Sequence, residues 1–290
     1  MNEQRRLNSL FESDVYMAAL PVAHRINGKN NIIGSASYIM PGVFLTAKHL
    51  VDEWFAQGLL SEEQMPQATN EDFGIDLLHL LKDKELIVWR IRKIHYIPDS
   101  DLALMIAQAV DGDRAKELLG LNLNVQLDVH IPKIGENVMS LGYPNTISIP
   151  ETGRHQLRIL ESRGVVEDIH LKGAGLIKSA CIQTNLIVDG GMSGGPVFNK
   201  YGRLCGINSS GIPPTDESSD YTSFASVIFK IFHTEIEMPL ESETLTRISL
   251  AELARQGYIT VTGMDHFKSE GENILWHAVS DECSECPGEG

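Results

Sequence analysis

A serine lies in a glycine-rich segment that connects two apolar runs. Ser193 stands within 189–197, which has glycines at 190, 191, 194 and 195 and a proline at 196. Glycines allow positive φ angles and let main-chain N–H groups approach a bound carbonyl group. Because the oxyanion formed by nucleophilic attack needs such donors, the N–H groups of Gly191 and Ser193 are candidates for an oxyanion hole. The alternative is a glycine-rich hairpin with an incidental serine.

A serine hydroxyl is a weak nucleophile until a base accepts its proton, and a histidine suits that role near neutral pH. The sequence contains ten histidines. His49 is the candidate, because it stands in 44–51, where a predicted strand ends and a short helix begins. Single histidines elsewhere are more typical of surface or satisfied core positions, for example His24, His79, His130 and His155.

An imidazole that acts as a base must be held in one tautomer by a carboxylate. Asp101 precedes the apolar run 102–107, so its side chain can point inward from the start of a predicted strand. Asp99 is the competing carboxylate, and its place directly after Pro98 is more typical of a solvated turn. The residue types therefore predict a nucleophile, a base and an orienting acid.

The elements that must position these residues are mostly short apolar runs bounded by Gly, Pro and Asn, a pattern that predicts strands. The runs are 16–22, 32–40, 43–46, 85–97, 102–107, 123–131, 138–141, 158–166, 180–187, 196–198 and 204–208. Helical patterns are fewer and cover 48–57, 113–119, 221–235 and 250–256. Ser249 and Glu252 have the spacing of a capping box for the last of these helices. Polar stretches at 58–74 and 213–220 are predicted to be surface loops, so the pattern favours an all-β sandwich or barrel.

The composition narrows the class of protein further. The chain has 290 residues and a net charge of −15. Its hydrophobic fraction of 42% is typical of a globular protein. An acidic chain is poorly suited to binding nucleic acid or an anionic membrane, so we expect neither as a partner. No apolar stretch has the length of a secretory signal or a membrane span, so we expect a cytoplasmic protein. Four cysteines are too few for a disulfide scaffold, and Cys181 and Cys205 are predicted to be reduced core residues.

Three segments, in the order His, Asp, Ser, resemble the trypsin-like (chymotrypsin-fold) serine peptidases, most closely HtrA-type and related bacterial domains. They are Thr46-Ala47-Lys48-His49, Asp101-Leu102-Ala103-Leu104 and Gly191-Met192-Ser193-Gly194-Gly195-Pro196. Further matching landmarks are Gly34-Ser35-Ala36-Ser37, Leu141-Gly142-Tyr143-Pro144, Gly164-Val165-Val166 and Ile182-Gln183-Thr184-Asn185. The resemblance implies an all-β fold of two packed six-stranded barrels, with His49 and Asp101 on the first barrel and Ser193 on the second.

The resemblance also implies a division of the chain and a reaction. We expect an N-terminal arm over 1–14, a peptidase domain over 15–235 and a C-terminal extension with a flexible acidic tail over 236–290. The implied activity is hydrolysis of protein or peptide substrates through an acyl-enzyme, without a cofactor or a metal. The alternative is a catalytically silent module that binds extended peptides or partner proteins by strand addition.

The sequence departs from the family's pattern in three ways. Met192 replaces the acidic residue that precedes the nucleophile in members activated by cleavage, so we expect no such activation. Leu50 stands where a cysteine usually follows the histidine, in keeping with a disulfide-free protein. The 55 residues from 236 to 290 are fewer than a PDZ domain needs, so we expect substrates to be recruited differently. We expect regulated activity, because Gly190 and Gly191 would permit the oxyanion loop to switch. We also expect a regulatory partner protein or ligand, because an ungated protease in a reducing compartment is a hazard.

The substrate pocket is predicted by position within the family. The residue six places before the nucleophile, Ile187, would form the base of the pocket, and the wall would come from Asn208, Ser209 and Ser210. An apolar base offers no partner to a buried charge, so small or medium apolar residues are expected before the scissile bond. Asp189 is a competitor that would create a basic preference.

The C-terminal residues give the weakest signal. Cys283 and Cys286 form a CxxC pair without a second pair, and His277 is too weak a partner to complete a site. Because a structural zinc site needs four ligands, a flexible tail is favoured over a metal site. The sequence makes no prediction about the oligomeric state.

Overall fold

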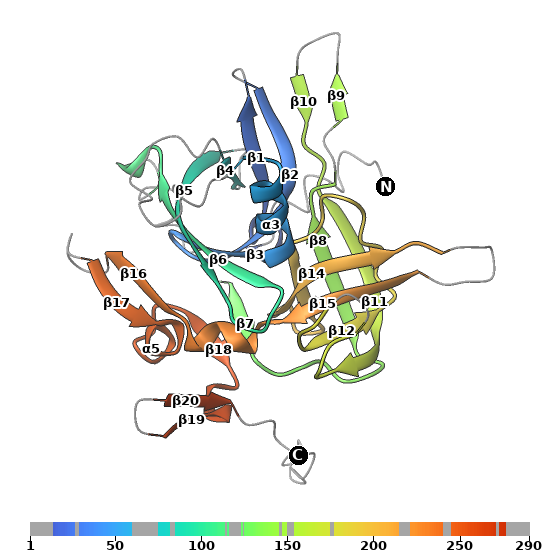
Figure 1. Ribbon diagram of the computed structural model, residues 1–290, viewed down its shortest axis with the longest axis vertical. Coiled ribbons are helices and arrows are strands. Elements are labelled where there is room, and N and C mark those ends of the chain that lie inside the picture. The colour runs from blue at the N-terminus through green and yellow to red at the C-terminus, as the bar shows by residue number, and fades with distance from the viewer. Residues whose placement is uncertain are drawn as a thin grey trace, which may run out of the picture.

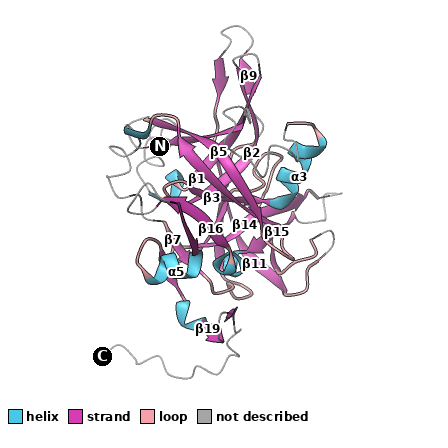
Figure 2. Ribbon diagram, turned by 60° about the vertical axis from the view of Figure 1, so that its left-hand side comes forward, coloured by secondary structure: helices cyan, strands magenta, loops and turns pink. Residues whose placement is uncertain are grey.

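Two β-barrels make up most of the described chain (Figures 1 and 2). The protein is represented by a computed structural model. It describes residues 14–26, 29–59, 75–81, 85–113, 115, 123, 125–144, 147–149, 154–174, 177–214, 221–239, 245–270 and 273–276. The predicted all-β, two-barrel fold is confirmed.

The first barrel is closed and antiparallel, with strand order β1-β2-β3-β6-β5-β4. Its strands are β1 (Ala19–Ile26), β2 (Lys29–Met40), β3 (Val43–Ala47), β4 (Ile75–Leu80), β5 (Leu86–Tyr96) and β6 (Leu102–Ala109). All of β3 is buried, and the Phe44 ring meets Tyr38 and Trp89 edge to face, with centroids 5.9 and 5.3 Å apart. Such contacts make a rigid base for the end of β3.

The second barrel closes through the order β13-β8-β11-β12-β15-β14, because β13 also pairs with β14. Its strands are β8 (Asn137–Gly142), β11 (Leu160–His170), β12 (Cys181–Thr184), β13 (Pro196–Asn199), β14 (Leu204–Ile212) and β15 (Thr222–Val227). A further strand, β7 (Gln126–Asp128), lies parallel to β14 on the outside of this ring. Hairpin β9 (Ile147–Ile149) with β10 (Arg154–Gln156) projects from it, at the top of Figure 1.

Helix α3 (Lys48–Ala56) follows β3 directly, close to the predicted range 48–57. It buries Leu50, Val51 and Trp54 against the first barrel. A side chain at Gly34 would come within 2.7 Å of Leu50 Cδ1, so the leucine packs tightly on β2 at the position where the family usually has a cysteine. A short helix, α2 (Asp14–Met17), precedes β1.

The predicted helix over 221–235 is wrong. This segment forms strand β15 and then the 3₁₀ helix η2 (Ile228–His233). Residues 223–227 are all buried, and a continuous buried run has no periodicity that separates a helix from a strand. Strand β4 was not predicted. Most of the ranges 58–74 and 113–119, and part of 213–220, lie outside the described residues.

The C-terminal extension contacts both barrels, through the pairing of β18 (Thr260–Thr262) with β7 beside the second barrel and through Lys93 on β5 of the first, which donates to Glu237 at 3.0 Å. It contains hairpin β16 (Glu235–Pro239) with β17 (Leu245–Ser249), helix α5 (Leu250–Arg255), strand β18, 3₁₀ helix η3 (Met264–His266) and hairpin β19 (Phe267–Glu270) with β20 (Asn273–Trp276). The Ser249 half of the predicted capping box is confirmed, because the Glu252 N–H donates to Ser249 Oγ at 3.1 Å. The Glu252 carboxylate instead accepts from Arg255 and Gln256, at 3.1 and 2.9 Å. Strand β18 pairs in parallel with β7, and His130 Nε2 lies 3.0 Å from His266 Nε2.

The two cysteines within the described residues are free and buried, as predicted. Burial raises the pKa of the Cys181 thiol to about 11, so this thiol stays protonated and unreactive. Cys283, Cys286 and His277 lie outside the described residues. Among the helices of the described chain, none is long and apolar enough to cross a membrane.

Candidate active site

The pairing of β3 with β6 brings His49 and Asp101 together. Ala47, the last residue of β3, pairs with Leu102, the first residue of β6. The residue that follows one strand therefore lies beside the residue that precedes the other, and the Lys48 N–H donates to the Asp101 carbonyl at 3.2 Å. The start of α3 then directs His49 toward the Asp101 side chain.

The carboxylate of Asp101 binds His49 at two points. The main-chain N–H of His49 donates to Oδ1 at 2.9 Å, and Nδ1 of the ring lies 2.9 Å from Oδ2. Because a carboxylate accepts, Nδ1 carries the proton in the neutral ring and Nε2 keeps a lone pair that can act as a base. This is the arrangement that a histidine base requires.

Burial alone would raise the pKa of the Asp101 carboxyl, but the bonds from His49 and Ser209 oppose it. The hydroxyl of Ser209, on β14, donates to Asp101 Oδ2. The net effect is a pKa below the usual value of an aspartate, so Asp101 is ionised at neutral pH. Side chains from both barrels thus hold one negative charge.

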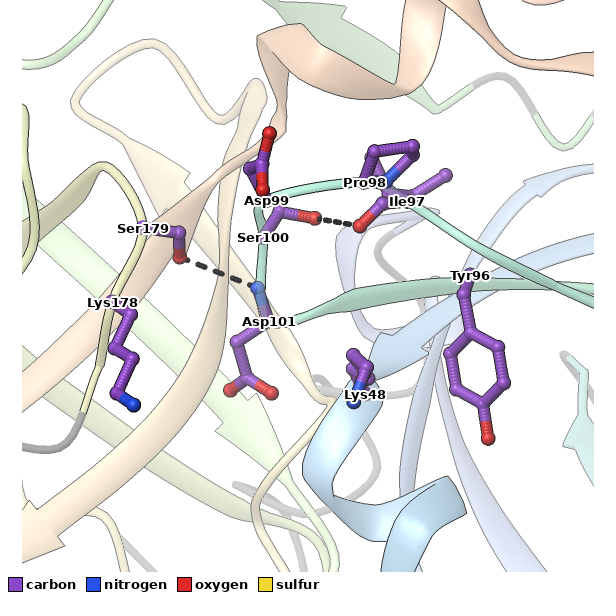
Figure 3. Close-up of a pocket in the computed structure, with 9 residues that line it drawn as sticks. All are labelled: Lys48, Tyr96, Ile97, Pro98, Asp99, Ser100, Asp101, Lys178 and Ser179. Atoms are coloured by element: carbon purple, nitrogen blue, oxygen red, sulfur yellow. Dashed lines mark hydrogen bonds between the residues drawn. The ribbon is translucent and has the colours of Figure 1, made fainter.

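A cavity of about 420 Å³ lies next to Asp101 on the surface between the barrels (Figure 3). In Figure 3 the N–H of Asp101 donates to the hydroxyl of Ser179, from the second barrel, at 3.3 Å. Asp99 has a left-handed φ of 49° in the turn before β6, and its carbonyl accepts from Lys230 at 2.5 Å. Asp99 is therefore a turn residue, and Asp101 is the carboxylate that contacts His49.

The segment before Ser193 forms a tight turn. The Met192 N–H donates to the Asp189 carbonyl at 3.0 Å, and Gly191 has a φ of 95°. A positive φ at the third position defines a type II turn and favours glycine there. Met192 is fully buried and packs on Gly142, where an added Cβ would come within 2.8 Å of it. An apolar contact thus anchors the position that is acidic in the trypsin-like peptidases activated by cleavage.

The first barrel holds the nucleophile turn through strand β2. The Ser35 N–H donates to the Ser193 carbonyl at 3.0 Å, and the Ser35 hydroxyl donates to the Gly191 carbonyl at 2.7 Å. The Ser37 hydroxyl donates to the Gly194 carbonyl at 3.1 Å. Gly194 has a φ of 82°, and a Cβ there would lie 2.2 Å from the Ser35 carbonyl oxygen, so only glycine fits.

A second cavity, of about 480 Å³, brings the predicted triad residues together. Its lining comprises His49, Asp101, Ile177, Val188, Asp189, Gly190, Ser193, Ser209, Ser210 and Gly211. The Ser193 hydroxyl donates to the Ser209 carbonyl at 3.5 Å, and among the hydrogen bonds of the described residues none joins Ser193 to His49. Catalytic hydrogen bonds are often formed only in the substrate complex, so this geometry is compatible with a resting enzyme.

The predicted oxyanion donors are available. Within the described part of the chain, the N–H groups of Gly191 and Ser193 donate to no protein acceptor, whereas those of Met192, Gly194 and Gly195 do. Two free donors, one on each side of Met192, could receive a substrate oxyanion.

The predicted pocket residues occupy different environments. Ser209 and Ser210 line the cavity. Ile187 does not; its side chain is 51% exposed, while its N–H donates to Ser162 Oγ at 2.7 Å. Its neighbour Val188 is buried and lines the cavity, because successive side chains of an extended segment point to opposite sides. Asn208 is buried, and its side chain bonds to main-chain carbonyls beside the turn.

Sequence reasoning missed several contributions. Ser179 and Ser35 were not predicted as site residues, and Ser209 was predicted as a pocket wall but also binds Asp101. Ser35 lies in a segment that resembles the family, which was the available signal. Ser179 had none, because its partner is a main-chain N–H on the other barrel. Within the described ranges, no group of three or more His, Cys, Asp or Glu side chains could hold a metal ion.

The chain was compared with known protein families, curated proteins and solved structures. The family model described as the trypsin-like peptidase domain matches residues 34–207. A search of curated proteins finds no match. Among solved structures, the chain is similar to Rv3671c from M. tuberculosis in an inactive form, with 14% identity over 79% of this chain and 90% of that one and a TM-score of 0.45. A second inactive-form structure of Rv3671c protease has 14% identity, coverage of 78% and 90%, and a TM-score of 0.46. The serine endoprotease from Yersinia pestis has 17% identity, coverage of 75% and 61%, and a TM-score of 0.45.

Proposed function

The chain belongs to the trypsin-like peptidase domain family, and on that premise we propose that it is a serine endopeptidase. One observation carries the proposal. Two hydrogen bonds join His49 to Asp101, and both residues line the same cavity as Ser193. A silent binding module would have no need of an oriented imidazole and a half-buried serine in one cavity.

In the proposed reaction Ser193 Oγ attacks the carbonyl carbon of the scissile peptide bond while His49 Nε2 takes its proton. The N–H groups of Gly191 and Ser193 stabilise the oxyanion. His49 returns the proton to the departing amine, and Asp101 stabilises the charged imidazolium. Water, activated by the same imidazole, then hydrolyses the acyl-enzyme.

Specificity is proposed to come from the apolar part of the cavity. Val188 and Ile177 are both buried and present aliphatic surface, whereas Asp189 is exposed at the rim. A cationic side chain placed against Val188 would lose its hydration without a buried partner. Small or medium apolar residues before the scissile bond are therefore favoured, as predicted, with Val188 in place of Ile187 as the selecting residue.

Labelling by a fluorophosphonate probe tests the proposal directly. Wild-type protein should be labelled and should hydrolyse peptides, and Ser193→Ala should lose both, with a fall of about 10⁶ in the rate. Ser226→Ala is the matched control, because this buried serine of β15 lies outside the lining of the cavity and its hydroxyl has no hydrogen-bond partner within the described residues. Equal labelling of wild type and Ser193→Ala would overturn the assignment, and a folded wild type that never labels would favour the binding module.

A further inference from the structure

Asn208 is a buried polar residue at the centre of the second barrel, directly before Ser209. Its side chain is 1% exposed, and all of its polar atoms have partners. The amide nitrogen donates to the Met192 carbonyl at 3.2 Å and to the Leu141 carbonyl at 3.3 Å, while the amide oxygen accepts from Ser140 Oγ at 2.9 Å. A buried amide that is fully satisfied has one fixed orientation.

The main chain of Asn208 holds the same turn. Its carbonyl accepts from the Gly194 N–H at 2.8 Å, and its N–H donates to the Gly195 carbonyl at 2.9 Å. Together with the bond to Met192, three of its hydrogen bonds reach residues on both sides of Ser193. No bond from its side chain points into the cavity that a substrate would enter.

The bond to Met192 has a consequence for the oxyanion hole. The Met192 carbonyl and the Ser193 N–H belong to one planar trans peptide, so they point in opposite directions. When Asn208 and the Gly195 N–H, which donates at 3.0 Å, fix the carbonyl on the inner side, the Ser193 N–H is fixed toward the outer side. This N–H is one of the two free donors of the turn.

From these contacts we infer that Asn208 is a positioning residue, which aims the Ser193 N–H at the substrate oxyanion by holding the Met192 carbonyl. The inference rests on the proposed peptidase activity and assigns Asn208 to the oxyanion machinery rather than to the pocket wall. Removing the amide leaves the Met192 carbonyl with one donor instead of two, so the peptide plane can rotate. Since the oxyanion develops only in the transition state, the loss falls on kcat and leaves KM nearly unchanged.

Asn199 provides a matched control. It is a buried asparagine of the same barrel, 8% exposed, and its side chain also makes three hydrogen bonds. These bonds reach Asp128, Tyr201 and Arg203, away from the nucleophile turn. Asn199→Ala and Asn208→Ala should therefore lower the thermal midpoint by comparable amounts. A purely structural role for Asn208 predicts equal kinetics for the two variants.

The kinetic experiment compares both variants with wild type on one peptide substrate and one peptide boronic acid, whose tetrahedral adduct places an oxygen in the oxyanion hole. Asn208→Ala should lower kcat by about ten- to a hundred-fold, with KM little changed, and should weaken boronic acid binding by the same factor. Asn199→Ala should change neither. Ser140→Ala, which removes only the partner of the Asn208 amide oxygen, should act in the same direction as Asn208→Ala but less strongly, and it serves if the latter does not fold.

Hydrogen exchange separates failure of this inference from failure of the proposed activity. The Gly195 amide, which donates to the Met192 carbonyl, should exchange at least about ten-fold faster in Asn208→Ala and at the wild-type rate in Asn199→Ala. A variant with unchanged kcat and unchanged Gly195 exchange would overturn the positioning role. If wild-type protein hydrolysed no peptide, the peptidase proposal would be overturned. The exchange rates of the Gly195 amide would still decide whether Asn208 holds the turn.

Discussion

The hydroxyl of Ser193 donates to the main-chain carbonyl of Ser209, 3.5 Å away, and not to His49. Ser209 also donates its own hydroxyl to Asp101. One residue of β14 therefore contacts two of the three proposed catalytic side chains, through its carbonyl and its hydroxyl. A weak bond of this length is easily exchanged, so a rotation about Cα–Cβ of Ser193 can bring its hydroxyl to the imidazole.

The hydroxyl of Ser209 should matter for turnover. Removing a hydrogen bond to a charged, partly buried carboxylate typically costs about 1.5–3 kcal/mol, so Ser209→Ala should lower kcat/KM by about ten-fold or more. Ser226→Ala, on the neighbouring strand β15 and outside the cavity, should have little effect, because its buried hydroxyl has no hydrogen-bond partner within the described residues. The ratio of kcat/KM for the two variants is the measurement, and equal values would show that the contact with Asp101 is dispensable.

The two aspartates before β6 should differ sharply. Asp101→Asn places an amide against His49, which favours the wrong tautomer, and should lower the rate by about 10⁴. Asp99→Asn should leave the rate unchanged, because the residue serves a left-handed turn that asparagine adopts readily. Hydrolysis of one peptide substrate by each variant decides the point. A large effect at Asp99 and none at Asp101 would contradict the assignment.

The pocket prediction concerns Val188 against Ile187. Wild type should cleave after Ala, Val or Leu in preference to Arg, Lys, Asp or Glu, since neighbouring aliphatic side chains differ by only about 1–3 kcal/mol while a buried unpaired charge costs more. Val188→Phe should fill the cavity and shift the preference toward the smallest residues. Ile187→Phe, at a half-exposed position, should not.

A peptide-library profile of the three proteins checks this expectation. Cleavage after Arg by wild type would contradict the role of Val188 and indicate that Asp189 selects the residue before the scissile bond. If Ile187→Phe changed the cleavage profile and Val188→Phe did not, Ile187 would be the residue that forms the pocket.

Stability should depend on pH through His79. Burial lowers the pKa of this side chain to about 4, against the effect of its bond to the Met17 carbonyl, and its other nitrogen accepts from Trp89. The unfolded chain binds the proton near pH 6.5 and the folded chain only near 4, so stability increases with pH across this window and is lost on acidification. His79→Gln should flatten the dependence. The measurement is the urea midpoint of unfolding between pH 7 and 4.5, for wild type and for His79→Gln. If the midpoints of the two proteins changed in parallel with pH, the role of His79 would be refuted.

The contact between His49 and Asp101 was predicted from the need of a histidine base for a carboxylate and from the family resemblance. The structure adds the physical reason, because each residue lies next to a strand end and these two strands are paired. Local sequence placed Ser193 in a glycine-rich turn, since the turn needs glycine at 191 and 194. These parts of the site follow from local sequence and one pairing. The family resemblance supplied the rest of the two-barrel arrangement.

Other features depend on contacts that no local pattern records. Ile187 and Val188 are both aliphatic, and only the path of the chain decides which of them faces the cavity. Strand β15 is buried on both sides and therefore resembles a core helix in sequence. The bonds from Ser179 and Ser35 cross between the barrels and join polar groups to the main chain, so neither partner is marked by its residue type.

The parallel pairing of β18 with β7 has a consequence for synthesis on the ribosome. The six strands of the second barrel, and every residue of the proposed site, are translated before β18. Until Thr260–Thr262 emerge, β7 presents an unpaired edge next to a barrel that can already close. Such an edge can pair with another nascent chain. Strand β18 therefore covers an edge of β7 that stays unpaired until the last part of the chain has been made.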